Sequence, residues 1–486
     1  DRLKLSSKFL KMIGVKVKST SNSLKIFGIP NLETRKTYII KNFMKDHRIF
    51  MLACIASLVL GGTWSSYSME YREQFVNECY YAANTFFDDK SIPQREMKSM
   101  EEEQKINESA RANIIGFTIE TRPDCITKEE LDSFRRFGIT RVQIGVQHTD
   151  NKILKKINRQ CTIEQAMLGI KALKNDNFKV LTHWMPNLPG SSPEKDREML
   201  NRVSTDPNLS SDEVKIYPTI VTSTSDKDTN EVNSVIEKWY NDGKYIPYSD
   251  DELEDVLIDF LSTVPEWMRI SRLFRDIPKP NSVSGCDSPN MREILMTKMD
   301  ELGLECKCIR SREVKDNEYD EGSIYYDYIE YEASDGMEYF IYCKALDKES
   351  TKEYLLGFIR LRLPYQDKYT GCLKNFALIR ELHVYSPMKT TYNSNKNATS
   401  TQHKGIGRTL LKLAEKISYY DGWYKMVVIS GVGVRNYYRK FGYELYNGYM
   451  VKSLVYESRI KLLRIVLVSI ISIMAYWLYS IFKMYY

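Results

Sequence analysis

Two short stretches of the chain carry residue types that could do chemistry. "GFTIETRPDCITKEEL", residues 116–131, is a strand-like apolar run that ends in Glu120 and Arg122 beside a proline. Charged residues at the carboxyl end of a strand in a β/α barrel usually face a substrate. "QHKGIGRTLLKLAEKI", residues 402–417, places Gly405 and Gly407 at the start of an amphipathic helix. Backbone N–H groups at such a turn, together with the helix dipole, form a site for a pyrophosphate.

Each motif alone has a plainer interpretation. A lone glycine turn is more often an ordinary helix start, and Glu120 with Arg122 could equally form a surface ion pair. The surrounding elements must therefore decide.

Short apolar strands alternate with longer amphipathic helices from residue 49 to about 275. Strand candidates include "ASLVLGG", "IIGFTIE", "RVQIGVQ", "KVLTHWM" and "EVKIYPT". The helix predicted over 163–173 places a set of apolar residues near one face: Ile163, Ala166, Met167, Ile170 and Leu173. This alternation predicts parallel strand pairing, as in an α/β barrel or open sheet.

The second half of the chain differs in composition. Residues 276–315 are rich in Pro, Ser and Gly before a helix and are predicted to be a linker element. Its Cys306 and Cys308 lack a neighbouring His or further Cys, so we predict a structural role and no metal site. Residues 316–456 contain tyrosine-rich strands and then the glycine turn and its helix, which predicts a separate α+β domain.

The order of elements around the glycine turn resembles the acetyltransferase superfamily related to the Gcn-type histone acetyltransferases (GNAT-like). "LIRELHVY" precedes the turn and "MVVISGVGVRNYYRKFGY" follows the helix. The resemblance implies acetyl-CoA as cofactor, with its pyrophosphate held by the turn and helix start and its pantetheine arm held by the preceding strand. The turn residues are Gln402, Gly405, Ile406, Gly407, Arg408 and Thr409, and the strand residues are Glu381, Leu382, His383 and Val384. Tyr437 or Tyr438 would meet the thiol, where a phenol can protonate a leaving thiolate.

Motifs in both halves together resemble the catalytic subunit of Elongator. "GGTW", "GFTIETRPD", "HWMPNLPG", "VKIYPT", "RDIPKP" and "ISGVGVRNYYRKFGYE" occur in the family's order between residues 57 and 454. The resemblance implies a partial radical S-adenosylmethionine β/α barrel over 49–275, followed by the acetyltransferase domain. Gly61, Gly62 and Thr63 would line the methionine amino group, and Glu120 and Arg122 would face the adenosylmethionine. His183, Lys215 and Tyr217 are candidates to line the cavity.

The activity implied by this resemblance is modification of the wobble uridine of tRNA. Acetyl-CoA would supply a two-carbon unit, and radical chemistry would attach it to uridine carbon 5. Expected partners are tRNA and other Elongator-type subunits. Two alternatives stay open: a protein lysine acetyltransferase that uses only the second domain, and a tRNA-binding scaffold without radical chemistry.

The chain departs from the family in its first residues. The family's 4Fe–4S cluster needs three cysteines in one loop, but residues 1–53 contain none, and residues 1–48 form an atypical basic segment. Since the first residue is Asp1 and not Met, we expect the chain to be incomplete at its N-terminus. In "MPNLPG", Asn187 replaces the family's usual Asp, which removes a charge near the expected cavity.

The C-terminus predicts a membrane anchor. "IVLVSIISIMAYWLYSIF", residues 465–482, is uncharged and long enough to cross a bilayer, with basic residues on both sides. We expect a tail anchor at 462–482 with the catalytic part in the cytosol. The resemblance to tail-anchored family members makes the outer mitochondrial membrane the first expected destination and the endoplasmic reticulum the second.

Overall charge says little about nucleic acid. The formal net charge is +6, and the 28% of residues that are charged are interspersed along the chain. Two local basic clusters could contact RNA phosphates, although such clusters are more often solvated: Arg269, Arg272, Arg275 and Lys279; and Arg435, Arg439 and Lys440. The nine cysteines form no C-x-x-C pair, which favours a reducing compartment.

Overall fold

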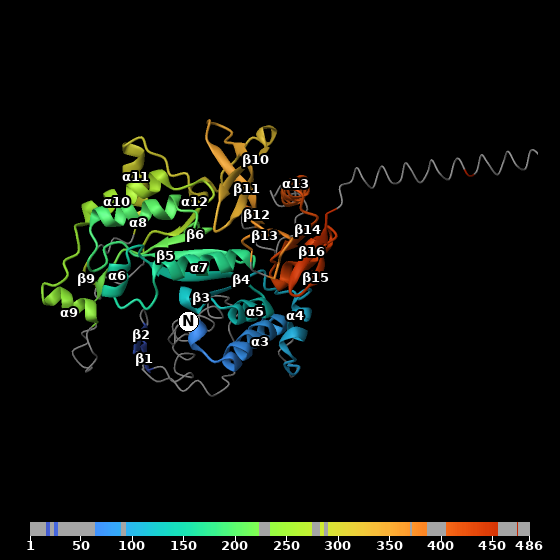
Figure 1. Cartoon of the computed structure of the whole chain (residues 1–486), viewed down its shortest axis with the longest axis horizontal. Helices are drawn as coiled ribbons and strands as arrows, with labels where there is room; N and C mark the ends of the chain where they lie inside the picture. The colour runs from blue at the N-terminus through green and yellow to red at the C-terminus, as the bar shows by residue number, and fades with distance from the viewer. Residues whose placement is uncertain are drawn as a thin grey trace, which may run out of the picture. The chain divides into compact units, whose positions relative to one another are not determined.

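The structure is a computed structural model (Figure 1). It describes residues 16–19, 24–27, 64–88, 94–222, 234–274, 282–285, 290–369, 372–385, 405–454 and 474. The chain divides into two compact units, residues 1–69 and 70–486. In the first unit, β1 (Lys16–Ser19) and β2 (Leu24–Phe27) form an antiparallel pair, and η1 (Trp64–Ser66) is a single 3-10 turn. The predicted strand and Gly61, Gly62 and Thr63 lie outside the described residues.

The first sheet of the second unit is parallel throughout. Its five described strands follow one another in chain order: β3 (Phe117–Thr121), β4 (Ile139–Gln147), β5 (Lys179–Trp184), β6 (Glu213–Ile216) and β8 (Arg269–Arg272). Helices lie between or before these strands: α3 (Met69–Thr85), α4 (Met100–Asn107), α5 (Lys128–Arg136), α6 (Asn151–Lys156), α7 (Ile163–Asn175), α8 (Pro193–Thr205), α9 (Val235–Asn241) and α10 (Asp250–Thr263). The predicted α/β alternation is therefore confirmed.

Local sequence explains where these helices begin. The hydroxyls of Thr127 and Thr162 cap α5 and α7, and Gln165 completes a capping box on α7. Four of the five residues predicted to share the buried face of α7 are buried, while Met167 is partly exposed. Because α7 packs this face on the sheet, the apolar period predicted its position. Short elements complete this half: η2 (Pro123–Cys125), and β7 (Val221–Thr222) paired with β9 (Ser282–Ser284).

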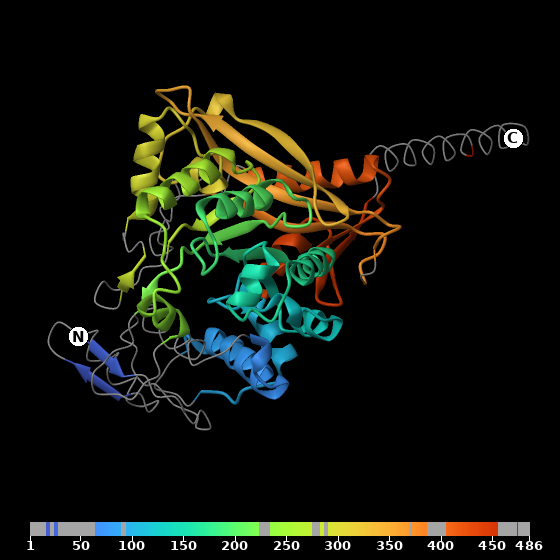
Figure 2. The same ribbon diagram turned by 60° about the vertical axis from the view of Figure 1, so that its left-hand side comes forward.

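The second sheet has seven strands and is almost entirely antiparallel. Its order is β10 (Tyr325–Glu332), β11 (Gly336–Leu346), β12 (Glu353–Pro364), β13 (Ala377–Val384), β14 (Lys425–Val428), β16 (Tyr449–Ser453) and β15 (Glu444–Tyr446). Only β13 and β14 pair in parallel. The long strands β10, β11 and β12 run side by side in Figure 2. Helices α11 (Met291–Glu301) and α12 (Ile309–Arg312) and the turn η4 (Glu321–Ser323) precede the sheet.

Helix α13 (Ile406–Tyr420) connects the parallel pair and packs on β11, β12 and β13. Its apolar stripe, Ile406, Leu410, Leu411 and Ala414, is buried in the core of this sheet. After β14 come the turn η6 (Val432–Val434) and the five-residue helix α14 (Arg435–Arg439). The predicted order of antiparallel strands, glycine turn and helix is therefore confirmed.

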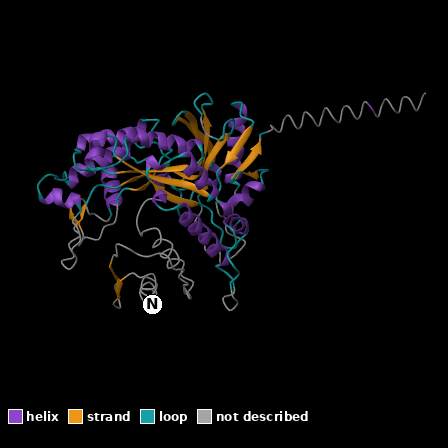
Figure 3. Cartoon of the chain, turned by 60° about the horizontal axis from the view of Figure 1, so that its bottom comes forward, coloured by secondary structure: helices purple, strands orange, loops and turns teal. Residues whose placement is uncertain are grey.

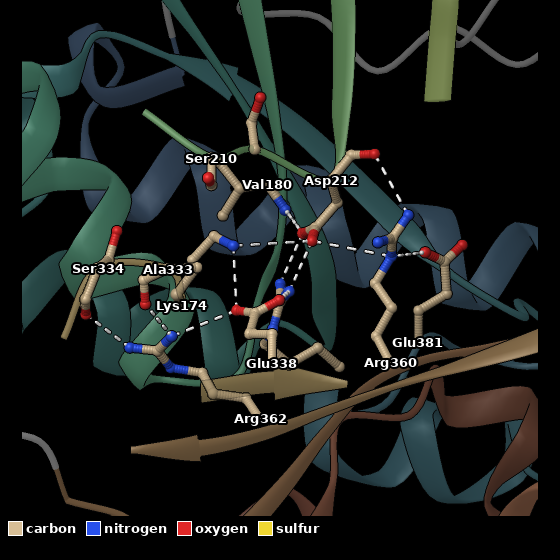
Figure 4. A network of polar contacts seen from close by, with 12 residues as sticks. Lys174, Val180, Ser210, Asp212, Ala333, Ser334, Glu338, Arg360, Arg362 and Glu381 are labelled. Atoms are coloured by element: carbon tan, nitrogen blue, oxygen red, sulfur yellow. Dashed lines mark hydrogen bonds and ion pairs between the residues drawn. The ribbon is translucent and has the colours of Figure 1, made fainter. Parts of the chain in front are cut away.

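A network of buried charges joins the two sheets, which lie side by side in Figure 3. Both Asp212 carboxylate oxygens accept hydrogen bonds of 2.6 Å from Arg380 of β13, and the Val180 amide donates to the same carboxylate at 2.8 Å. Glu338 of β11 accepts from Lys174 of α7 at 3.0 Å (Figure 4). Because these groups have left water, their mutual pairing is needed to offset desolvation.

Two glycines allow a second close contact between the halves. A Cβ on Gly431 would lie 2.1 Å from the Ile115 carbonyl oxygen, and one on Gly433 would lie 2.7 Å from the Asn113 Cβ. The Gly433 amide also donates to the Ile114 carbonyl at 2.8 Å. The glycines of "SGVGV" therefore serve the packing of residues 113–116 directly onto η6.

Candidate active site

Strands β13 and β14 separate beyond a short stretch of pairing. They pair only from Ala377↔Met426 to Ile379↔Val428. On its other side β13 stays paired with β12 as far as Val384↔Gly357. Among the described residues, no strand covers the β14-side edge of residues 381–384. With respect to the described strands, their backbone groups on that edge are therefore unpaired and could bind a ligand.

The start of α13 lies at this opening. Gly405 adopts a left-handed conformation, φ 78°, as the N-cap, and no side chain caps the helix. A Cβ on Gly407 would lie 2.6 Å from the Tyr437 hydroxyl and 3.5 Å from Val384 Cγ2. Strand β13, α13 and α14 therefore meet so closely at Gly407 that a larger residue would clash with Tyr437. We call the opening bounded by residues 381–384, 405–407 and Tyr437 the strand wedge.

The predicted turn residues divide by the direction of their side chains. Ile406 is buried in the core, Arg408 is exposed, and Thr409 donates its amide hydrogen to the Gly405 carbonyl at 3.0 Å. Ile406 can therefore bind a ligand only through its backbone. Gln402 lies outside the described residues.

The two candidate tyrosines occupy different positions. Tyr437 is half-buried and its hydroxyl touches Gly407, whereas Tyr438 is 6% exposed and packs on Tyr443 with ring centroids 5.9 Å apart. Neither hydroxyl has a hydrogen-bond partner among the described residues. Burial raises the pKa of both Tyr437 and Tyr438. Both phenols therefore keep their protons at neutral pH and can donate them.

The strand residues of the wedge have unequal roles. The Glu381 carboxylate binds Lys179 of β5 at 2.5 Å and Arg360 at 3.0 Å, so its side chain belongs to the contact between the sheets. His383 is exposed, and its ring lies 4.5 Å from the Tyr385 ring and 5.9 Å from the Phe358 ring. The predicted ligand contacts of Glu381 are consequently limited to its backbone.

The second group of predicted residues lies at the carboxyl ends of the parallel strands. Glu120 on β3 has a side chain 58% exposed, and its Oε1 lies 3.5 Å from Nδ1 of His183 on β5. His183 Nε2 lies 3.1 Å from Gln143 Oε1, which also accepts from Lys215 at 2.5 Å. The Tyr217 ring meets the His183 ring edge-on at 5.6 Å. The structure therefore brings all four predicted residues together.

Gln143 was not among the predicted site residues, although it links two of them. It lies on β4, in register with Glu120. The sequence feature that could have identified Gln143 is its polar side chain within the strand "RVQIGVQ", where every second side chain lies on the same face. In a half-buried parallel strand, a polar side chain on the inner face indicates that this face lines a ligand-binding site.

Burial controls protonation at these strand ends. Desolvation, with Lys215 and Arg159 nearby, lowers the pKa of His183 to about 3, so the imidazole is neutral at physiological pH. Desolvation also lowers the pKa of Lys215. A neutral imidazole beside the open Glu120 carboxylate can hold a polar or cationic ligand group by hydrogen bonds and charge.

Arg122 is engaged locally. It binds the Asp124 carboxylate at 2.6 Å and the Gln160 carbonyl at 3.4 Å. The surface ion pair considered for Glu120 and Arg122 is therefore made by Arg122 with Asp124, and Glu120 stays open.

Charged side chains continue from these strand ends toward the strand wedge. Lys179 precedes His183 by four residues on β5 and binds both Glu213 and Glu381 at 2.5 Å. Arg141 of β4 also binds Glu213, at 3.1 Å. Because alternate residues of a strand share one face, His183 and Lys179 line the same polar face, which ends at β13.

Other sequence candidates have structural partners. Arg269 binds Glu313. Arg435 and Arg439 both bind Glu108. Arg275 and Lys279 lie outside the described residues. Asn187 is buried with φ 63°, and its amide pairs with the backbone N–H and C=O of Tyr248. The Asn187 side chain donates to the Tyr248 carbonyl, which an Asp carboxylate could not do. This contact explains why an Asn fits at this position.

Comparisons with known proteins agree with this arrangement. Residues 67–203 match the Radical SAM superfamily, and residues 211–301 match the Radical_SAM C-terminal domain. A tRNA uridine(34) acetyltransferase of Methanocaldococcus infernus is 38% identical over 82% of this chain and 72% of its own length. Elongator complex protein 3 of Mus musculus is 34% identical over 82% of this chain and 69% of its own length.

A solved structure is also similar. Archaeal M. infernus Elp3, with an N-terminal deletion of residues 1–46, is 36% identical with a TM-score of 0.71, covering 81% of this chain and 89% of that one. The two family matches, which span the parallel sheet, place the chain in the radical SAM class. Within it, the chain belongs to the family of the tRNA uridine(34) acetyltransferases and Elongator complex protein 3.

Proposed function

We propose that the chain modifies the wobble uridine of tRNA as an Elongator-type acyltransferase, with acetyl-CoA as the two-carbon donor and radical SAM chemistry. The observation that carries the proposal is the joining, in one unit, of a radical SAM sheet and a strand wedge suited to coenzyme A. The relatives' names supply the substrate, uridine 34 of tRNA. Other Elongator-type subunits are expected partners.

The strand wedge is the proposed acetyl-CoA site, and the second sheet with α13 and α14 the proposed GNAT-like acetyltransferase domain. The Gly405 turn and the uncapped N–H groups of α13 suit a pyrophosphate. The open edge of residues 381–384 suits the amides of a pantetheine arm, which pair as an added strand would. The absence of a Cβ at Gly407 lets Tyr437 lie close against the glycine turn, where a Cβ would be 2.6 Å from its hydroxyl.

S-adenosylmethionine is proposed to bind at the carboxyl ends of the parallel strands. The open Glu120 carboxylate suits its cationic groups, and His183 and Gln143 supply hydrogen bonds. When bound with a reduced 4Fe–4S cluster, this cofactor supplies a carbon radical. The described residues hold no group of three potential metal ligands, and we derive no step through the cluster.

The substrate is tested in cells that express the chain. Depleting it should remove the carboxymethyl-type modification from uridine 34, measured by mass spectrometry of tRNA nucleosides, and re-expression should restore it. Unchanged uridine 34 would contradict the proposal. If protein acetylation fell while uridine 34 stayed modified, the lysine acetyltransferase alternative would replace it.

The two tyrosines are expected to act on different parts of the coenzyme. Tyr437 touches the glycine turn, which is the pyrophosphate end, so we assign the thiol to Tyr438, a residue 6% exposed whose hydroxyl has no hydrogen-bond partner among the described residues. Tyr438→Phe should lower kcat for tRNA-dependent acetyl-CoA turnover by about 10²-fold, the usual size for a lost general acid, with KM little changed. Tyr437→Phe should mainly raise KM. Steady-state kinetics separate the two, and the reverse pattern would overturn the assignment.

The membrane anchor stays a proposal from sequence. Residues 462–482 lie outside the described residues except Met474, and among the described residues no helix is long and apolar enough to cross a bilayer. We expect a chain truncated after Lys461 to move from the membrane pellet to the soluble fraction of lysed cells. The full chain should resist extraction by carbonate, and a truncated chain that still pelleted would contradict the anchor. Imaging would then distinguish the outer mitochondrial membrane from the endoplasmic reticulum.

A further inference from the structure

A cavity of about 740 Å³ lies where the helices below the first sheet meet the last hairpin of the second. Helices α4 and α5 form one wall, and α14 with the β15–β16 hairpin forms the other. It is separate from the strand wedge and the carboxyl strand ends, since none of their residues lines it. Its volume is in the range of pockets that hold small molecules.

One wall contains a buried arginine without an acidic partner. Arg135 is only 6% exposed, and it donates to the Ile139 and Gly448 carbonyls. Its guanidinium lies 4.5 Å from the centroid of the Tyr449 ring. No carboxylate among the described residues pairs with it. Buried charges in proteins are normally paired, so this guanidinium calls for an anion.

A second buried arginine lies close by with incomplete hydrogen bonding. Arg435 is 5% exposed, and its Nη1 binds Glu108 at 3.1 Å, while its buried Nε has no acceptor among the described residues. Glu108 is shared with Arg439, at 2.7 Å. One carboxylate therefore serves two guanidinium groups at this wall.

The remaining acidic groups of the cavity do not supply the missing charge. Glu101 binds Arg136 at 2.9 Å, and Asp132 binds the neighbouring Lys128 at 3.0 Å. Asp176 accepts a hydrogen bond from Cys372 at 3.4 Å, and burial raises the pKa of this carboxyl group. Arg135 consequently has no carboxylate partner among the described residues, and Arg435 shares its one carboxylate, Glu108, with Arg439.

We propose that this cavity binds a phosphate group, with Arg135 and Arg435 as its cationic wall. The planar guanidinium matches the geometry of phosphate oxygens, and charge-assisted hydrogen bonds are strong where water is excluded. The phosphate could come from an RNA backbone or from a free nucleotide or inorganic phosphate. Arg435 lies on the same short helix as Tyr437 and Tyr438, so an occupant would also hold α14 in place.

The test is calorimetric titration of the full chain with inorganic phosphate, with coenzyme A present to occupy the strand wedge. Leu445 lines the cavity and is 41% exposed, so Leu445→Glu adds a negative charge without disturbing the core. Leu445→Glu and Arg435→Gln should each weaken phosphate binding by roughly tenfold or more. Arg197→Gln removes an arginine that does not line the cavity and pairs with Asp259 at 2.7 Å, and it should leave phosphate binding unchanged.

A short RNA stem-loop distinguishes the sources. If the cavity takes an RNA phosphate, the stem-loop competes with phosphate, and Leu445→Glu weakens RNA binding and lowers its salt slope by about 1. If it takes a free anion, Leu445→Glu removes phosphate binding and leaves RNA binding unchanged. Equal phosphate and RNA affinities in wild type, Leu445→Glu and Arg435→Gln would overturn the proposal. Failure of coenzyme A to bind would count against the strand wedge alone, because the Leu445→Glu comparison still reports on the cavity.

Discussion

Gly407→Ala is expected to lower the affinity for acetyl-CoA by roughly tenfold or more. The added Cβ would lie 2.6 Å from the Tyr437 hydroxyl and 3.5 Å from Val384 Cγ2, so Tyr437, which bounds the strand wedge, would have to shift. Alanine is the better helix former, so a general loss of helix stability cannot explain the effect. Calorimetric titration with acetyl-CoA measures it directly.

The matched control is Gly322→Ala in the same half of the chain. There the nearest atom to a new Cβ is Asp320 Oδ1 at 3.4 Å, an ordinary contact. This variant should bind acetyl-CoA as the wild type does. Equal affinities for Gly407→Ala and wild type would remove the strand wedge as the coenzyme site.

Asp212→Asn is expected to cost about 3–5 kcal/mol of unfolding free energy, the usual penalty for breaking a buried charge pair from one side. Asp212 is fully buried and accepts hydrogen bonds from both Arg380 Nη atoms and from the Val180 amide. The variant removes one of the two carboxylates that pair with the buried Arg380 guanidinium and leaves Glu338 as the other. Urea unfolding followed by circular dichroism gives the difference. A surface control, Glu318→Gln, breaks only the exposed pair with Lys348 and should not shift the transition measurably.

The same network predicts the response to acid. Arg380 and Lys174 lower the pKa values of Asp212 and Glu338 despite the opposing effect of burial. Carboxylates with lowered folded-state pKa values stabilise the fold fully above their unfolded pKa of about 4, and this contribution is lost as the pH falls through the folded values. Wild-type stability should therefore decline below about pH 4, and Asp212→Asn should decline less steeply. Parallel acid curves for the two proteins would contradict this role of Asp212.

Periodicity and local motifs predicted the elements well. The apolar spacing over 163–173 identified α7, because a helix packed on a sheet must bury one face. The glycine turn predicted the start of α13, where Gly405 is the left-handed N-cap. Gly407 also needs to lack a Cβ, because Tyr437 lies against it. Glu120 was predicted from the end of a strand and His183 from the family resemblance, and parallel pairing brings the two strand ends to one edge of the sheet.

Long-range partners were not predictable in the same way. Gln143 joins His183 to Lys215 only because β4 lies between β3 and β5, and its residue type alone carries no such information. Glu381 appeared to be a coenzyme residue by position, yet Lys179 of the first sheet holds its carboxylate. Contacts between separate halves depend on their packing, which a single sequence does not display.

The measurement that most directly tests this account is an experimental structure of the full chain with acetyl-CoA bound. We predict pyrophosphate oxygens on the backbone N–H groups that follow Gly405, the pantetheine arm along residues 382–384, and the thioester beside the Tyr438 hydroxyl. A coenzyme bound away from the open edge of β13, or a β14 that closes against residues 381–384 when it binds, would contradict the central claim.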